Sequence, residues 1–169
     1  MNSKEKIIDT YKRLVVKKQG AKVTVKEVCD ELTISRTTFY KYFKDTYDIL
    51  EYIFVNDAIQ QIEALFSANL EPETIMEGWY LSFYRNKEFY CYAIKDDGQN
   101  SLFYTVISVI TDYNKKIYKD LVEEKDLEYY AYKYASLQAM LLKKWMNDGM
   151  IVEPKEMAKY FLTDIMSEH

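Results

Sequence analysis

Glycine and proline are scarce in this sequence, with four and two copies among 169 residues. β-Hairpin architectures need turn residues roughly every 8 to 12 positions, and this chain does not supply them. Hydrophobic residues make up 49% of the sequence and charged residues 30%, which suits long amphipathic helices that close one core. The composition therefore predicts an all-α protein.

Histidine and cysteine are also rare. The only histidine is His169, and Cys29 and Cys91 lie on separate predicted apolar helix faces, where they fit small buried hydrophobes better than a disulfide. The sequence has no Cys/His cluster, no glycine-rich phosphate loop and no Ser/His pairing. We therefore expect no catalytic residues, no metal and no cofactor, and we predict that the protein is not an enzyme.

Long apolar runs are missing as well. No segment approaches the roughly 18 apolar residues of a membrane span, and the N-terminal segment MNSKEKIIDTYK has no apolar stretch suited to a signal peptide. These features predict a cytoplasmic protein that does not contact a membrane.

The net charge of −4 is unevenly distributed. Residues 1–50 contain 11 Lys and Arg against 7 Asp and Glu, a balance of +4, whereas residues 51–169 contain 12 against 20, a balance of −8. Exposed charges are screened over about 8 Å at physiological salt, so a phosphate near the basic end would barely feel the acidic end. An acidic chain of this kind can still bind DNA through its N-terminal part.

Two short helix signatures separated by a tight turn occupy residues 24–46, TVKEVCDELTISRTTFYKYFKDT. Thr24 followed by Glu27 is a capping box, and Ser35 can cap the next helix. Phe39 and Phe43 are four residues apart and point to the same side, toward a core. This spacing predicts a helix-turn-helix that presents its second helix to a DNA groove.

The remaining periodicity predicts a preceding helix around residues 7–15 and a long helix over 46–66. After a break at 70–72, further helices are expected over 75–84, 89–94, 102–121 and 127–148, and beyond Pro154. We predict a three-helix DNA-binding head, residues 1–46, joined by a long helix to a helical dimerisation body, residues 47–169, to which the family resemblance given below adds effector binding.

The last two helices carry more apolar surface than a small monomer needs, which predicts a homodimer with a four-helix bundle across a two-fold axis. The residues expected at that interface are Ala131, Tyr134, Ala135, Gln138, Leu142, Trp145, Met157, Phe161 and Ile165.

The segment TVKEVCDELTISRTTFYKYFKDTYDIL resembles the DNA-binding signature of the TetR family of bacterial transcriptional regulators, and the resemblance covers residues 5–54. The segment KKWMNDGMIVEPKEMAKYF looks like the corresponding region of a subgroup that includes activators of dihydroxyacetone kinase operons. The resemblance implies a DNA-binding regulator that acts on double-stranded DNA as a homodimer on a pseudo-palindromic operator.

Carried over by position, the resemblance implies that Thr24 and Tyr40 contact phosphates and that Lys44 serves the DNA backbone. It places four further residues near base edges, namely Arg36, Thr37, Thr38 and Lys41. Arg36 fits best on physical grounds, because a guanidinium there can bind guanine O6 and N7 in a bidentate pair. The family usually has Lys where this chain has Thr46, which removes one expected phosphate contact unless the Thr46 hydroxyl or a helix N-terminal amide replaces it.

A second departure is Thr33, which stands where the family usually has Gly. A β-branched residue disfavours the positive φ angle that such a turn requires.

The body holds a set of aromatic residues, Trp79, Phe83, Tyr84, Phe89, Tyr92 and Phe103. They can be ordinary core residues, or they can line a pocket for a small-molecule effector, which the resemblance implies for this region. A third interpretation is a protein coactivator that binds a tyrosine-rich surface without any small-molecule pocket. The sequence leaves these alternatives open.

Overall fold

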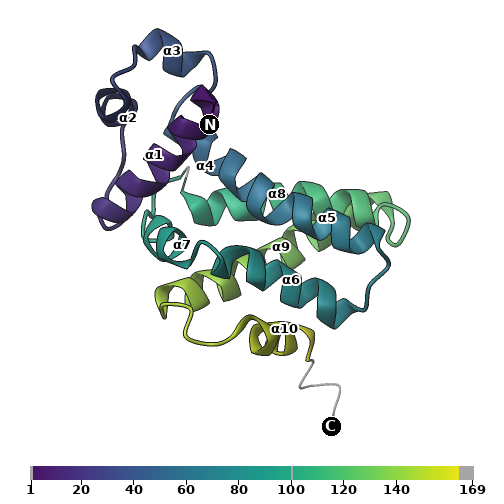
Figure 1. Cartoon of the computed structure of the whole chain (residues 1–169). Coiled ribbons are helices and arrows are strands. Elements are labelled where there is room, and N and C mark those ends of the chain that lie inside the picture. The colour runs from purple at the N-terminus through teal and green to yellow at the C-terminus, as the bar shows by residue number, and fades with distance from the viewer. Residues whose placement is uncertain (1, 100, 164–169) are drawn as a thin grey trace.

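The computed structural model describes residues 2–99 and 101–163, and every regular element in these ranges is a helix (Figure 1). The predicted all-α class is confirmed. None of these helices is long and apolar enough to cross a bilayer.

The head consists of α1 (Ser3–Lys17), α2 (Val25–Leu32) and α3 (Arg36–Tyr40). α1 packs on α2, which in turn packs on α3, the helix at the far end of the head in Figure 1. Ile7 and Phe39 are both fully buried in the core of this unit. The predicted three-helix arrangement is therefore present.

A continuous helical segment leads from the head along the body. It consists of α4 (Thr46–Phe54), a π-helical turn η1 (Val55–Ile59) and α5 (Gln60–Ser67). The predicted helix over 46–66 is correct in extent, but the π turn was not predicted. Such turns widen the helix locally and often occur at functional positions.

The body contains α6 (Pro72–Tyr84), α7 (Lys87–Ala93), α8 (Leu102–Tyr118), α9 (Glu124–Asn147) and α10 (Pro154–Leu162). α8 packs along α9, and α10 lies against α6 (Figure 1). α6 and α10 each begin with proline, which suits the first turn of a helix because its missing N–H would have no partner there.

Head and body meet where α1 packs against α7. Gly20, just after α1, has a φ of +90°, and a Cβ at this position would lie 2.5 Å from the carbonyl oxygen of Tyr92. Only glycine combines this backbone conformation with so close an approach.

A polar cluster ties the same junction to the π turn. Asp57 Oδ2 accepts hydrogen bonds from Lys12 Nζ at 3.2 Å, Asn86 Nδ2 at 3.0 Å and Tyr90 Oη at 3.1 Å. Lys12 belongs to the head, Asp57 to the connecting helix, and the other two to the body. Burial, followed by the Asp57 charge, raises the pKa of the Tyr90 phenol well above its ordinary value, so this group stays protonated and donates.

Candidate nucleic-acid interface and central cavity

The first helix of the helix-turn-helix begins with the predicted capping box. The Glu27 amide donates to Thr24 Oγ1 at 3.2 Å, while the Thr24 amide and hydroxyl donate to Glu27 Oε2 at 2.7 and 2.8 Å. Lys18 Nζ lies 2.7 Å from Glu27 Oε1. The hydrogen bonds from Lys18 and Thr24 lower the pKa of Glu27 from 4.5 to about 2. Thr24 is exposed, but both of its donors are taken within the cap.

The recognition helix α3 is capped by Ser35, whose Oγ accepts from the Thr38 amide at 3.0 Å. Phe39 on this helix and Phe43 just after it are buried, with ring centroids 6.3 Å apart, and they hold the segment against the head core. The predicted inward orientation of both rings is confirmed. The side of the short helix that carries Phe39 is therefore packed on the head core, while its other side faces solvent.

Polar side chains project from the solvent side of this segment. Arg36, Thr37, Lys41 and Lys44 are exposed, and Tyr40 is 55% exposed. Thr38 is half-buried, with its hydroxyl 3.0 Å from Ser35 Oγ, so it belongs in part to the cap.

Carboxylates of the described part of the chain do not neutralise the cations of this surface. Arg13 and Lys26 pair with carboxylates of α2. Within residues 2–99 and 101–163, Arg36, Lys41 and Lys44 form no ion pair. Their charges are thus available to an anionic partner. Tyr42, which was not among the predicted residues, is 41% exposed in the same segment.

Thr46 does not fit the predicted phosphate contact through its hydroxyl. The residue is only 6% exposed, and its Oγ1 donates to the Val23 carbonyl oxygen at 3.2 Å. The side chain joins the start of α4 to the segment before α2. The prediction for this hydroxyl was wrong, because the sequence showed a polar residue near a helix start but not the backbone oxygen that engages it.

Thr33 ends α2 in the left-handed conformation, with φ 54° and ψ 43°. The turn thus keeps the backbone geometry for which the family's usual Gly is suited, although a β-branched residue is strained in that region.

The body contains a cavity of about 470 Å³ lined by residues of η1, α5, α6, α8, α9 and α10. It opens to solvent on one side, where its lining residues Phe66, Tyr134 and Leu137 are exposed. Its walls are mainly apolar and aromatic, with Trp79, Tyr113 and Tyr118 among them, and Asn114 and Gln138 add amides. Burial raises the pKa of both tyrosines, so their phenols are neutral near pH 7.

Most of the predicted pocket residues lie elsewhere. Trp79 lines the cavity, but Phe83 and Phe89 are buried in the core. The rings of Phe83 and Phe54 stack there with their centroids 6.0 Å apart. Tyr84 stacks on Trp145 on another side of the body, with ring centroids 6.2 Å apart.

Tyr92 and Phe103 pack at the edge of the core and have no place in the cavity wall. Five of the six aromatic residues therefore do not line the cavity, and the pocket interpretation was wrong for them. An apolar stripe in the sequence cannot separate residues that fill a core from residues that line a cavity. The cavity residues Tyr113, Asn114 and Tyr118 were missed; their only signal was polar groups on the apolar stripe of α8.

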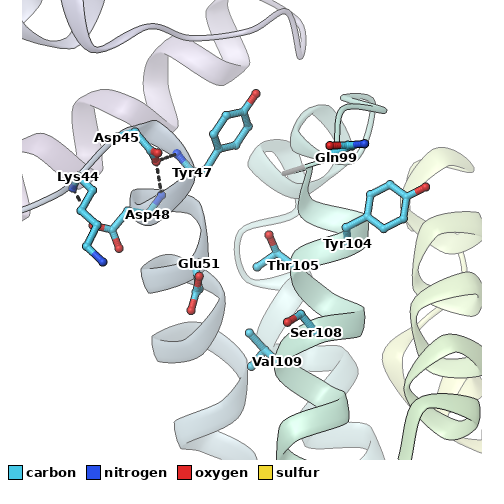
Figure 2. A pocket seen from close by; sticks show the side chains of 10 residues that line it. All are labelled: Lys44, Asp45, Tyr47, Asp48, Glu51, Gln99, Tyr104, Thr105, Ser108 and Val109. Carbon is cyan, nitrogen blue, oxygen red and sulfur yellow. Dashed lines mark hydrogen bonds between the residues drawn. The ribbon is translucent and has the colours of Figure 1, made fainter. Parts of the chain in front are cut away.

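A second, polar groove of about 450 Å³ lies between the start of α4 and α8 (Figure 2). Two of its three acidic residues, Asp45 and Asp48, already accept hydrogen bonds from backbone amides, and the third is the exposed Glu51. Asp45 accepts from the amides of Tyr47 and Asp48 at 2.8 and 2.9 Å, and Asp48 Oδ2 accepts from the Lys44 amide at 2.8 Å. These bonds cap α4 and fix the position of Lys44.

The predicted dimer interface is largely internal to the protomer. Five of its residues are buried, namely Ala131, Ala135, Leu142, Trp145 and Met157. Gln138 and Phe161 are half-buried, Tyr134 is exposed, and Ile165 lies outside the described residues. For the buried five the prediction was wrong, because the stripe of α9 that holds four of them, and Met157 on α10, pack within their own subunit. The exposed apolar side chains of α9 include Tyr130, Leu137 and Met140.

Residues 71–167, more than half of the chain, match a family profile described as "Transcriptional regulator C-terminal region" (TetR_C_8). The chain belongs to the TetR family of transcriptional regulators. This family assignment confirms the resemblance seen in the sequence. No curated protein matches the sequence of this TetR-family chain.

Two solved structures share the fold of this TetR-family protein. One is described as a TetR-family transcriptional regulator from Syntrophomonas wolfei, with a TM-score of 0.67 and 17% identity over 94% of this chain and 90% of that one. The other is the dihydroxyacetone kinase operon activator DhaS, with a TM-score of 0.62 and 14% identity over 98% and 94% of the two chains. At these identities, the similarity establishes the fold.

Proposed function

We propose that this TetR-family regulator binds a pseudo-palindromic operator as a homodimer, with α3 of each subunit in a major groove. The main support is the segment from Arg36 to Lys44. It exposes hydrogen-bond donors and cations on one side, and the buried rings of Phe39 and Phe43 anchor its other side in the core. Such a rigid, unpaired basic surface suits direct contact with base edges and phosphates.

Within this segment the roles follow from side-chain chemistry. Arg36, at the N-terminus of α3, reads guanine, with Thr37 and Lys41 beside it and Thr38 contributing at the edge of the cap. Tyr40 and Lys44 bind phosphates. Thr24 holds the start of α2 close to the DNA backbone, and its cap with Glu27 fixes that geometry.

The dimer forms through the outward face of α9. Tyr130, Tyr134, Leu137 and Met140 of α9 are all exposed, and Tyr134 and Leu137 among them also line the open side of the cavity. An apolar face of this kind on a water-soluble domain typically marks an interaction surface. On α10, Tyr160 is 61% exposed and adds to the available apolar area.

A small-molecule effector in the central cavity controls DNA binding. The cavity is bounded in part by η1 and α5, which belong to the helix that leads to the head. A ligand that favours one position of this helix would shift the spacing of the two heads and thereby operator affinity.

A protein coactivator is the alternative, supported by the exposed tyrosines Tyr129 and Tyr132 on α9. If operator affinity changes only when a partner protein is added, and with no small molecule, this alternative is favoured.

Selection of bound sequences from random duplex DNA, followed by footprinting, tests the DNA-binding function. We expect an enriched pseudo-palindrome whose half-sites are about 10 base pairs apart or at a related groove-matched spacing. Enrichment of no sequence would contradict the proposal. Sedimentation at micromolar protein tests the dimer, and a species that remains at the 20.2 kDa of one chain would exclude it.

A further inference from the structure

A groove of about 550 Å³ lies where head and body meet, between α1 on one side and the end of α6 and the start of α7 on the other. Five of the ten residues that line it are cationic, namely Lys12, Arg13, Lys17, Arg85 and Lys87. Among the described residues of the lining, Glu88 is the one acidic residue, and none of them also lines the central cavity. This junction groove is therefore a separate surface with its own charge.

Carboxylates neutralise only two of the five cations. Lys12 Nζ lies 3.2 Å from Asp57 Oδ2. Arg13 Nη1 lies 3.6 Å from Glu31 Oε1. Within residues 2–99 and 101–163, the other three cations form no ion pair, namely Lys17, Arg85 and Lys87, and Glu88 forms none either. With the two ion pairs counted as neutral, three cations and one carboxylate remain, so the groove keeps a net charge of +2.

The hydrogen bonds of these three cations do not compensate their charges. Arg85 Nη1 donates to the amide oxygen of Gln61 at 3.3 Å, which is a neutral acceptor. Lys87 Nζ donates to the Met150 carbonyl oxygen at 3.0 Å, which is neutral as well. Lys17 is exposed in the last turn of α1. A concave surface lined mainly by charges of one sign concentrates ions of the opposite sign, so this groove attracts anions.

The size and the remaining lining of the groove narrow the class of anion. Its volume lies within the range of sites for small organic molecules. Val16 and Tyr84, both half-buried, and the ring of Phe89 add apolar surface to the lining. A net charge of +2 matches a ligand with two negative charges, such as a phosphate monoester, which carries about −1.5 to −2 at pH 7.

We propose that the junction groove binds a small organic dianion, whose charged group lies between Lys17 of the head and Lys87 of the body and whose apolar part contacts Val16 and Tyr84. Such a ligand joins α1 to α7 and so favours this packing of head on body over other arrangements. The inference does not depend on the effector proposed for the central cavity. DNA is not the expected occupant, because α3 lies at the far end of the head from α7 (Figure 1).

Four probes test this class by amide chemical-shift titration of the full chain at pH 7.5 and low salt. Phenyl phosphate is an organic dianion, benzenesulfonate has one negative charge, inorganic phosphate lacks the ring, and benzyl alcohol is neutral. We expect phenyl phosphate to bind tightest and to shift amides of residues 12–17 and 84–89. Benzenesulfonate and inorganic phosphate should each bind about 3- to 10-fold more weakly, and benzyl alcohol not measurably.

Raising the salt concentration should weaken the binding of phenyl phosphate, because the cations are partly exposed. Equal affinity of phenyl phosphate and any of the other three probes would overturn the proposal. Shifts by phenyl phosphate that occur only outside residues 12–17 and 84–89 would overturn it as well.

Two variants test whether both parts of the molecule hold the dianion. Lys17→Gln in the head and Lys87→Gln in the body should each weaken phenyl phosphate about 3- to 10-fold, since each removes one uncompensated charge. The matched control is Lys6→Gln, because Lys6 is an exposed lysine on the same helix α1 that does not line the groove, and its affinity should equal that of the wild type. Unchanged affinity in both folded groove variants would overturn the proposal. If Lys87→Gln fails to fold, the variant at the exposed Lys17 decides.

A competition experiment separates a small anion from the DNA backbone. Random duplex DNA is added to protein saturated with phenyl phosphate, and the shifts of residues 12–17 and 84–89 should persist. Loss of these shifts would assign the groove to DNA phosphates and overturn the proposal. Absence of operator binding together with the expected probe ranking would overturn only the DNA-binding proposal.

Discussion

Tyr90 donates its hydroxyl hydrogen to Asp57 Oδ2 across 3.1 Å, which joins the short α7 helix of the body to the π turn of the connecting helix. The same carboxylate oxygen accepts from Lys12 of the head, so this one residue bridges all three parts of the molecule. Any movement of the connecting helix has to carry or break these bonds.

Asp57→Ala should destabilise the protein by about 1.5 to 3 kcal/mol, because it leaves the buried Tyr90 hydroxyl and the Lys12 ammonium without their partner. Tyr90→Phe should cost about 1 to 2 kcal/mol, since Asp57 keeps its other donors. Urea denaturation measures both. Glu51→Ala, an exposed carboxylate on the same helical segment, is the control and should change stability by less than about 0.5 kcal/mol. An Asp57→Ala protein as stable as this control would contradict the bridging role.

Thr33→Gly should stabilise the protein by about 0.5 to 1 kcal/mol. Thr33 is exposed and left-handed at φ 54°, so glycine relieves backbone strain and removes no buried contact. Thermal unfolding would show a higher Tm. Thr33→Ala keeps a Cβ and should recover little of the gain. A Thr33→Gly protein with a lower Tm than the wild type would show that the threonine is not strained.

Thr46→Val should destabilise the protein by about 1 kcal/mol while leaving the salt dependence of DNA binding unchanged, because the hydroxyl bonds to the Val23 carbonyl oxygen and not to DNA. Thr46→Ser keeps the hydroxyl and serves as the control for this bond. If the slope of log affinity against log salt concentration falls by about one unit in Thr46→Val, Thr46 does contact a phosphate, as the sequence predicted.

The Glu27 cap predicts a specific response to acid. Its pKa is lowered from 4.5 to about 2 in the folded chain, so its stabilising contribution is complete above about pH 4.5 and is lost as the pH falls toward 2. The stability difference between wild type and Glu27→Gln should therefore be largest near neutral pH and shrink through that window. Denaturation curves at several pH values check this expectation, and a difference that does not vary with pH would refute it. Because the side chain is still 38% exposed, salt should reduce the effect.

Local signals in the sequence predicted the head well. The Thr24 capping box, the Ser35 cap and the inward Phe39 and Phe43 pair are all set by neighbours within four residues, and all are present. The Thr46 hydroxyl was misjudged because its acceptor, the Val23 carbonyl oxygen, is 23 residues away in the sequence.

The body was harder to predict for the same reason. An apolar stripe shows that a face is covered, but not whether its own subunit, a second subunit or a ligand covers it. Ala131 and Ala135 are covered within the protomer, whereas Leu137 on the same helix is 55% exposed. Phe83 fills the core and Trp79, four residues earlier, lines the cavity. Only the packing of several helices together separates these cases.

The most direct test of DNA recognition by α3 is the affinity of Arg36→Ala for the selected operator and for a scrambled duplex, measured by fluorescence anisotropy at fixed salt. We expect operator affinity to fall by about 1 to 3 kcal/mol and discrimination against the scrambled duplex to shrink, because a bidentate base contact is lost. Arg85→Ala, an exposed arginine of the body, should leave both affinities unchanged. Equal operator affinity for Arg36→Ala and the wild type would contradict the account.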